Sequence, residues 1–113
     1  MLLVVSRSEA LRDAAARAEV VTFWVSEEAA LQEALERMPS GVLVDLNLEP
    51  AEFSIAAIER SKQSSLPVVA FLGRPAGRQA ILANLAGADR VISQEQLIEE
   101  LPTLELVDRP DPG

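Results

Sequence analysis

The carboxylate of Asp45 is the group in this sequence best placed for chemistry. It follows the apolar run Gly-Val-Leu-Val at 41–44, which predicts a buried strand. In a parallel α/β protein, ligands bind outside the carboxyl ends of the strands, where Asp45 is expected. The residues expected beside it, at the ends of neighbouring strands, are Ser6, Arg7, Leu72, Gly73, Ser93 and Gln94. This set holds no second acid, no histidine and no lysine, so the groups needed for catalysis are missing.

Composition narrows the classes of function. The 113 residues include no histidine and no cysteine, which removes the commonest general base, the commonest transition-metal ligand and any thiolate. We therefore expect no enzyme activity, no metal and no cofactor. The net charge of −8, without a long basic run, argues against nucleic acid or membrane as a partner. Residues 1–5 are too short for a signal peptide and no apolar run is long enough to span a membrane, so we expect a cytoplasmic protein.

Aliphatic runs alternate with segments of helical periodicity along the chain. We predict strands at 2–5, 20–25, 42–45, 67–72 and 90–92, each followed by a helix. Five such units predict a flavodoxin-like, three-layer α/β/α sandwich around a five-stranded parallel sheet of order 2-1-3-4-5. Residues 1–106 would form this domain, and the polar, proline-rich residues 107–113 a flexible tail.

Local signals predict where the helices begin and end. Ser6 starts a capping-box pattern, so it should cap the first helix, and Ser26 should cap the second. Ser93 or Gln94 should open the last helix. Gly87 should end the fourth in a left-handed conformation.

Three segments resemble the receiver domains of bacterial response regulators. Residues 42–50 are similar to the third strand of that family, 66–73 to its fourth strand, and 86–93 to the turn into its fifth. The resemblance covers residues 1–101 and implies that Asp45 occupies the position of the phosphorylated aspartate. The family's paired acids, its hydroxyl residue, its aromatic switch residue and its lysine correspond here to Ser6 and Arg7, Leu72, Val91 and Gln94.

Because the family's functional residue types are absent at these positions, the resemblance implies a non-catalytic pseudo-receiver that regulates signalling or transcription through protein–protein contacts. Phosphoryl transfer needs a metal or cations around the transferring group, and Asp45 alone would hold Mg²⁺ weakly. One alternative is a sensor of a small anionic metabolite held at the strand ends by Arg7, Arg74 and Arg78. A receiver that is phosphorylated at Asp45 is the third possibility.

The resemblance also implies where a partner would bind. The family's usual output and dimer surface corresponds to residues 78–86, 90–92 and 94–101. Because Pro102 shortens the last helix, we expect an apolar patch there, suited to a protein partner or to a homodimer. The patch would include Leu82, Leu85, Val91, Leu97 and Leu101, with Arg78, Arg90, Glu99 and Glu100 around it.

Overall fold

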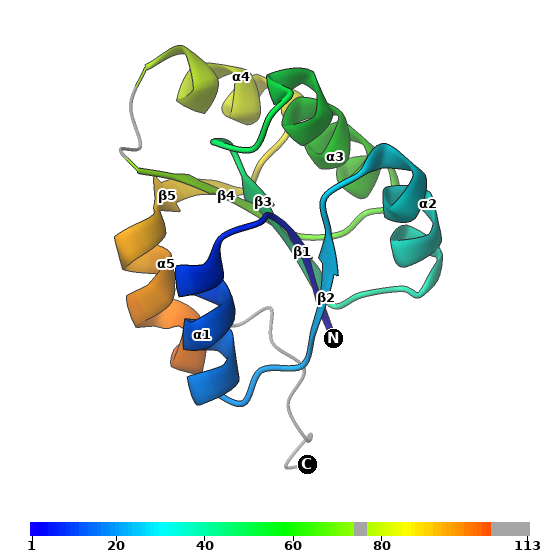
Figure 1. Ribbon diagram of the computed structural model, residues 1–113. Helices are drawn as coiled ribbons and strands as arrows, with labels where there is room; N and C mark the ends of the chain where they lie inside the picture. Colours follow the sequence, from blue (N-terminus) through cyan, green and yellow to red (C-terminus); the bar gives the residue numbers. More distant parts are fainter. Residues whose placement is uncertain (74–76, 105–113) are drawn as a thin grey trace.

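The computed structural model describes residues 1–73 and 77–104, which form one parallel sheet with helices on both faces (Figure 1). The strands run in the order β2-β1-β3-β4-β5, as predicted. Their bounds are β1 Leu2–Val5, β2 Thr22–Val25, β3 Gly41–Asp45, β4 Val68–Leu72 and β5 Arg90–Ser93. The helices are α1 Glu9–Arg17, α2 Glu28–Glu36, α3 Ala51–Gln63, α4 Arg78–Ala86 and α5 Gln94–Glu100, followed by the 3-10 turn η1 Leu101–Thr103.

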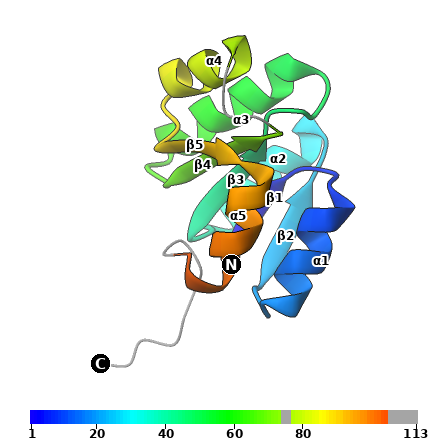
Figure 2. The same cartoon turned by 90° about the vertical axis from the view of Figure 1, so that its left-hand side faces the viewer.

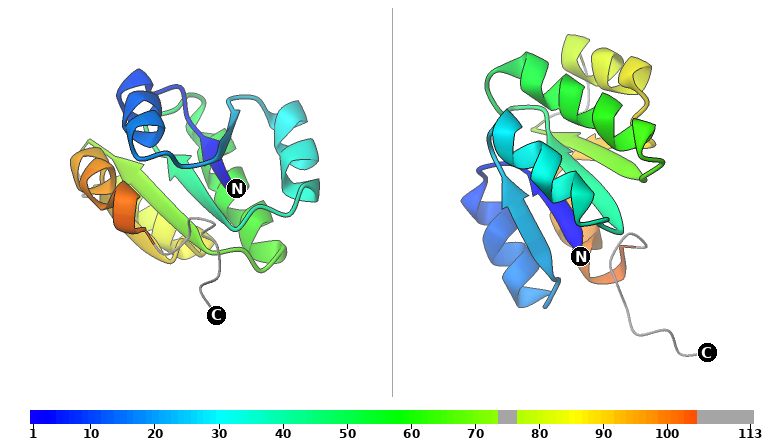
Figure 3. Two further views of the ribbon diagram at one scale, coloured as in Figure 1. Left: turned by 90° about the horizontal axis from the view of Figure 1, so that it is seen from below. Right: turned by 90° about the vertical axis from the view of Figure 1, so that its right-hand side faces the viewer.

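The helices divide into two layers, which Figure 3 shows on opposite sides of the sheet. Helices α1 and α5 cover one face, where they contact each other, and α2, α3 and α4 cover the other. In the described part of the chain, no helix is long and apolar enough to cross a bilayer. The expected tail, residues 107–113, lies outside the described residues.

The three inner strands are buried on both faces, which explains their unbroken apolar sequences. Along β3, Val42 and Val44 pack towards α2 and α3, whereas Leu43 packs towards α1 and α5. The register pairs Val5 with Val44 and Asp45 with Phe71. This pairing brings the ends of β1, β3 and β4 together at one edge.

Two of the predicted helix starts are wrong. The side chain that caps α1 is Ser8, whose Oγ accepts from the backbone N–H of Leu11, because Ser6 bonds elsewhere. The residue at the N-cap of α2 is Glu27 rather than Ser26, and its side chain forms no capping bond. The other ends agree with the sequence: Ser93 caps α5, and the C-cap residue of α4 adopts a left-handed conformation.

Strand β2 forms one edge of the sheet and begins at Thr22, two residues later than predicted. Its two aromatic side chains are each covered by an arginine. The guanidinium of Arg12 lies 4.7 Å from the ring centroid of Trp24, and that of Arg37 lies 4.5 Å from Phe23. The indole N–H of Trp24 donates to the hydroxyl of Thr22 at 2.8 Å. These contacts satisfy the indole and cover apolar surface at a strand with one free edge.

Candidate functional site

The candidate site lies at the carboxyl ends of β1 and β3. Asp45 is the last residue of β3 and Ser6 directly follows β1, so the parallel register sets them side by side. Both are buried, with exposed fractions of 7% for Asp45 and 2% for Ser6. A buried carboxylate must have hydrogen-bond partners, because an unpaired one would be costly to remove from water.

Both carboxylate oxygens of Asp45 are bonded within the chain. The hydroxyl of Ser6 donates to Oδ2 at 2.7 Å, and the backbone N–H of Asn47 donates to Oδ1 at 2.8 Å. The same Ser6 oxygen accepts from the backbone N–H of Ser8 at 3.0 Å. The hydroxyl of Ser54 in α3 donates to the backbone carbonyl of Asp45 at 2.8 Å. Asp45 therefore ties the loops after β1 and β3 to the start of α3.

The contact between Ser6 and Asp45 is the part of the site that sequence reasoning missed. Ser6 was expected at this edge but as a helix cap, since Glu9 follows it at capping-box spacing. Ser8, two residues later, takes that role and leaves Ser6 free to reach across to β3. The signal available in the sequence was the position of Ser6, one residue after a strand adjacent to β3.

Arg7 does not pair with the carboxylate. Within residues 1–73 and 77–104, no hydrogen bond or ion pair joins it to Asp45. Its side chain is exposed and lines a small depression with Glu27, Glu28 and Glu49. The charge of Arg7 thus lies among acids, away from the buried carboxylate.

The other positions of the site lack the groups that would hold a metal or a phosphoryl group. Leu72 is buried at the end of β4, and Gln94 is the first residue of α5. Among the described residues, no group of three acidic, histidine or cysteine side chains is arranged to bind a metal ion. Mg²⁺ is usually held by one or two carboxylates together with phosphate and water, so Asp45 alone would hold it weakly.

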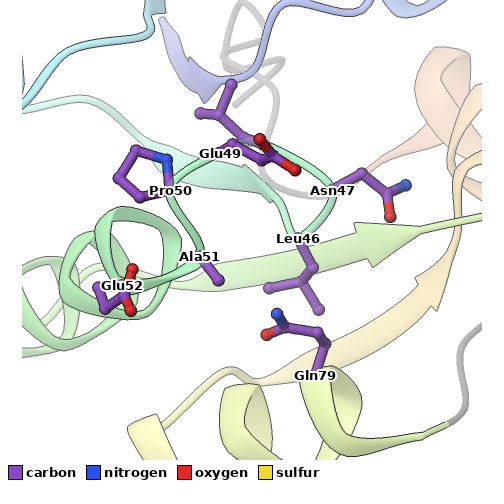
Figure 4. Close-up of a pocket in the computed structure, with 8 residues that line it drawn as sticks. Leu46, Asn47, Glu49, Pro50, Ala51, Glu52 and Gln79 are labelled. Atoms are coloured by element: carbon purple, nitrogen blue, oxygen red, sulfur yellow. The ribbon is translucent and has the colours of Figure 1, made fainter.

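A surface pocket of about 730 Å³ lies at the β3–α3 loop, which directly follows Asp45 in the chain (Figure 4). Its lining runs from Leu46 to Glu52, with Gln79 of α4 on the opposite wall. The charged side chains in it are Glu49 and Glu52, both exposed. Two carboxylates without a basic side chain in the lining make it unsuited to an anionic ligand.

The three arginines that could bind an anion are not brought together at one site within the described residues. Arg7 lines the depression between α2 and the β3–α3 loop, whereas Arg78 lines a groove between α3 and α4. Arg74 lies outside the described residues. The alternative of a metabolite sensor at the strand ends therefore gains no support from this arrangement.

The expected interaction surface is altered in two respects. Leu97 and Leu101 are buried, at 0% and 1% exposed, and so cannot belong to a surface patch. The reason is that Pro102 does not stop the chain from coiling: η1 continues α5, with the proline in its first turn, where it needs no backbone N–H. Leu101 and Leu104 then complete the core against α1 and α5.

Two of the charged residues expected around this surface, Arg90 and Glu100, pair with each other. Arg90 donates to both carboxylate oxygens of Glu100, at 2.8 and 3.1 Å. Hydrogen bonds from Arg90 and then Gln96 hold the pKa of Glu100 below its usual value. The apolar exposure that remains is on α4, where Leu85 is 80% and Ile81 is 61% exposed, while Leu82 and Val91 are partly buried.

Comparisons with known proteins give fold-level matches only. No protein-family model matches the chain, and no curated protein matches it. A protein of Chloroflexus aurantiacus assigned as a response regulator superposes with a TM-score of 0.71 at 19% identity, over 88% of each chain. A response regulator of Thermotoga maritima gives 0.65 at 20% identity, over 91% of this chain and 97% of that one. An orphan response regulator of H. pylori gives 0.63 at 17% identity, over 88% and 91%.

These matches and the strand order agree with each other. Five parallel strands in the order 2-1-3-4-5 and five helices are shared with solved receiver domains across nearly their whole length. At these identities, the likeness concerns the fold. The chain therefore has the fold of response-regulator receiver domains, as its sequence predicted.

Proposed function

We propose that this chain is a non-catalytic regulatory domain, a pseudo-receiver that acts in signalling or transcription control by binding protein and is not phosphorylated at Asp45. The observation that carries the proposal is the bonding of both Asp45 carboxylate oxygens within the chain, at 2.7 and 2.8 Å. A phosphoacceptor needs one oxygen free to attack and a cation on the other. Here Ser6 holds the first, and a loop amide holds the second.

The surroundings of Asp45 support the same conclusion. A transferring phosphoryl group carries negative charge that metal ions or basic side chains must neutralise. The position that would supply a second acid carries Ser6, and the position that would supply a lysine carries Gln94. Attack by Asp45, a residue only 7% exposed, would also break a charge-assisted hydrogen bond.

The partner in this proposal is another protein or a second copy of the chain, in the cytoplasm. The net charge of −8 favours neither nucleic acid nor an anionic membrane. Self-association would use the exposed side chains of α4, chiefly Leu85 and Ile81. Sedimentation equilibrium on wild type and on Leu85→Ser at high micromolar concentration decides between monomer and dimer.

Intact-mass measurement after incubation with acetyl phosphate and Mg²⁺ tests the proposal. We expect no added phosphate on wild type or on Asp45→Asn. A receiver domain that carries the paired acids and the lysine, treated in parallel, should gain one phosphate and so prove that the donor is active. Gain of one phosphate by wild type, absent in Asp45→Asn, would overturn the proposal.

A further inference from the structure

Helices α3 and α4 lie side by side on one face of the sheet (Figure 2). Their side chains leave a groove of about 650 Å³ between them. Its floor is apolar, formed by Ile55 and Ala56 of α3 and Leu82 of α4. All three are partly exposed, so the groove is open to solvent along an apolar base. The exposed side chain of Leu85, one turn beyond Leu82 on α4, extends this apolar surface outwards.

Two acids stand on the α3 side of the groove, and one basic side chain, that of Arg78, stands on its α4 side, so acids outnumber bases in the lining. Glu52 and Glu59 lie seven residues apart, one turn on either side of Ile55 and Ala56, and so share the face of α3 that lines it. Both are exposed, and neither forms an ion pair within the described ranges 1–73 and 77–104. Glu52 is partly accounted for by the first turn of α3, where acids are favoured, but Glu59 is not.

We infer that this groove binds an amphipathic helix of a partner protein, with apolar side chains on one face and lysine or arginine beside them. Two turns separate Glu52 from Glu59, a rise of about 10 Å, which matches the reach of apolar side chains at i, i+3, i+4 and i+7. The basic side chains would pair with the two acids. The inference rests on the proposed function and adds to it the binding surface and the chemistry of the partner.

The charge of the domain indicates which kind of molecule binds in the groove. A second copy would bring another chain of net charge −8 towards the same unpaired acids, and the two would repel. An acidic peptide or a nucleic acid would meet the same repulsion. A basic helix is instead drawn towards the whole domain, and it finds an apolar floor with two acids on the α3 side against the single Arg78 on the α4 side.

The test uses a synthetic amphipathic helix of about 14 residues, built from leucine and lysine at the spacing above, and a second peptide of the same composition in scrambled order. NMR chemical shifts on the full chain map the contact, and fluorescence anisotropy of the labelled peptide gives Kd. We expect shifts concentrated at residues 52–59 and 78–86 for the first peptide only.

Two pairs of variants separate the groove from net charge. Glu52→Gln with Glu59→Gln should weaken binding about five- to tenfold, because two charge pairs are lost. Glu36→Gln with Glu99→Gln removes the same charge from exposed positions on α2 and α5 and should change Kd less than about twofold. Leu85→Ser should weaken binding, whereas Met38→Ser, an equally exposed apolar side chain on the α2–β3 connection, should not.

Several outcomes would overturn the inference: no binding of the amphipathic peptide, equal binding of the scrambled one, equal effects of the two acid pairs, or shifts centred outside the groove. Dimerisation through Leu85 in the sedimentation experiment would do so as well, since it would make a second copy the occupant. None of these results touches the phosphorylation assay. Gain of phosphate at Asp45 is the separate result that removes the proposed function.

Discussion

Replacing Ser6 by alanine tests whether Asp45 has become a structural group. The change removes the donor to Asp45 Oδ2 and the acceptor for the backbone N–H of Ser8, at 2.7 and 3.0 Å. Hydrogen bonds to a charged group contribute about 1.5–3 kcal/mol, and the site is buried, so we expect a loss of about 2 kcal/mol in the free energy of unfolding. For a domain of this size, that loss lowers Tm by roughly 8–15 °C.

Urea denaturation followed by far-UV circular dichroism measures the effect. Ser26→Ala is the matched control, because Ser26 directly follows β2 as Ser6 follows β1 and no hydrogen bond of its side chain is found in the described ranges. It should change stability by less than about 0.5 kcal/mol. Asp45→Ala, which strands the Ser6 hydroxyl and the Asn47 amide, should cost about 3 kcal/mol.

A double-mutant cycle between Ser6→Ala and Asp45→Ala isolates their interaction. Residues in direct contact couple by about 0.5–3 kcal/mol, and this buried pair should give at least 1. A coupling near zero, or an effect of Ser6→Ala no larger than that of Ser26→Ala, would refute the reasoning. Asp45 would then be free of its neighbours, as a reactive carboxylate has to be.

Three further predictions concern stability. Val44→Asp should unfold the domain, because Val44 is fully buried in the central strand and an unpaired buried charge costs several kcal/mol against a total of about 5–15; loss of the circular dichroism signal checks it. Gly87→Ala should lower stability by about 1–2 kcal/mol in a urea titration, because Gly87 has a φ of 110° and an added Cβ would lie 3.0 Å from Lys62 Cγ. The pKa of Asp89 lies below its usual 3.8, because the Val68 N–H and then Lys62 donate hydrogen bonds to its carboxylate. The contribution of Asp89 to the free energy of unfolding is therefore present above pH 3.8 and is lost as the pH falls through the pKa of the folded state. Because Asp89 is half-exposed, Asp89→Asn should lower the free energy of unfolding by only about 1 kcal/mol at pH 7. In urea titrations at more acidic pH, the variant and wild type should become equally stable.

The fold was predictable from the sequence because burial on both faces leaves a signal in every residue of a strand. The runs at 2–5 and 41–44 are wholly apolar, and the helices between strands repeat every three or four residues. The position of Asp45 at the carboxyl edge came from the same reasoning and is confirmed.

The details of the site were less predictable, since they depend on competition between partners far apart in the chain. Ser6 could cap a helix or bond to Asp45, 39 residues away, and only the folded chain brings the second choice within 2.7 Å. Arg90 similarly pairs with Glu100 rather than standing free at a rim. Leu101 was expected at the surface because Pro102 ends an α-helix, yet a 3-10 turn accommodates that proline.

The position of Trp24 in the edge strand β2 has a practical consequence for spectroscopy. Trp24 is the single tryptophan of the chain, which also has no tyrosine, so fluorescence excited in the indole band reports one place: the edge of the sheet beside Arg12. Its emission should follow local opening of β2, which has only one neighbouring strand, before the inner strands separate. Fluorescence and circular dichroism would then give different unfolding midpoints. Helices α3 and α4 contact β3, β4 and β5, whereas Trp24 lies in β2 at the opposite edge of the sheet. A peptide bound in the groove between these helices should therefore leave the emission of Trp24 unchanged.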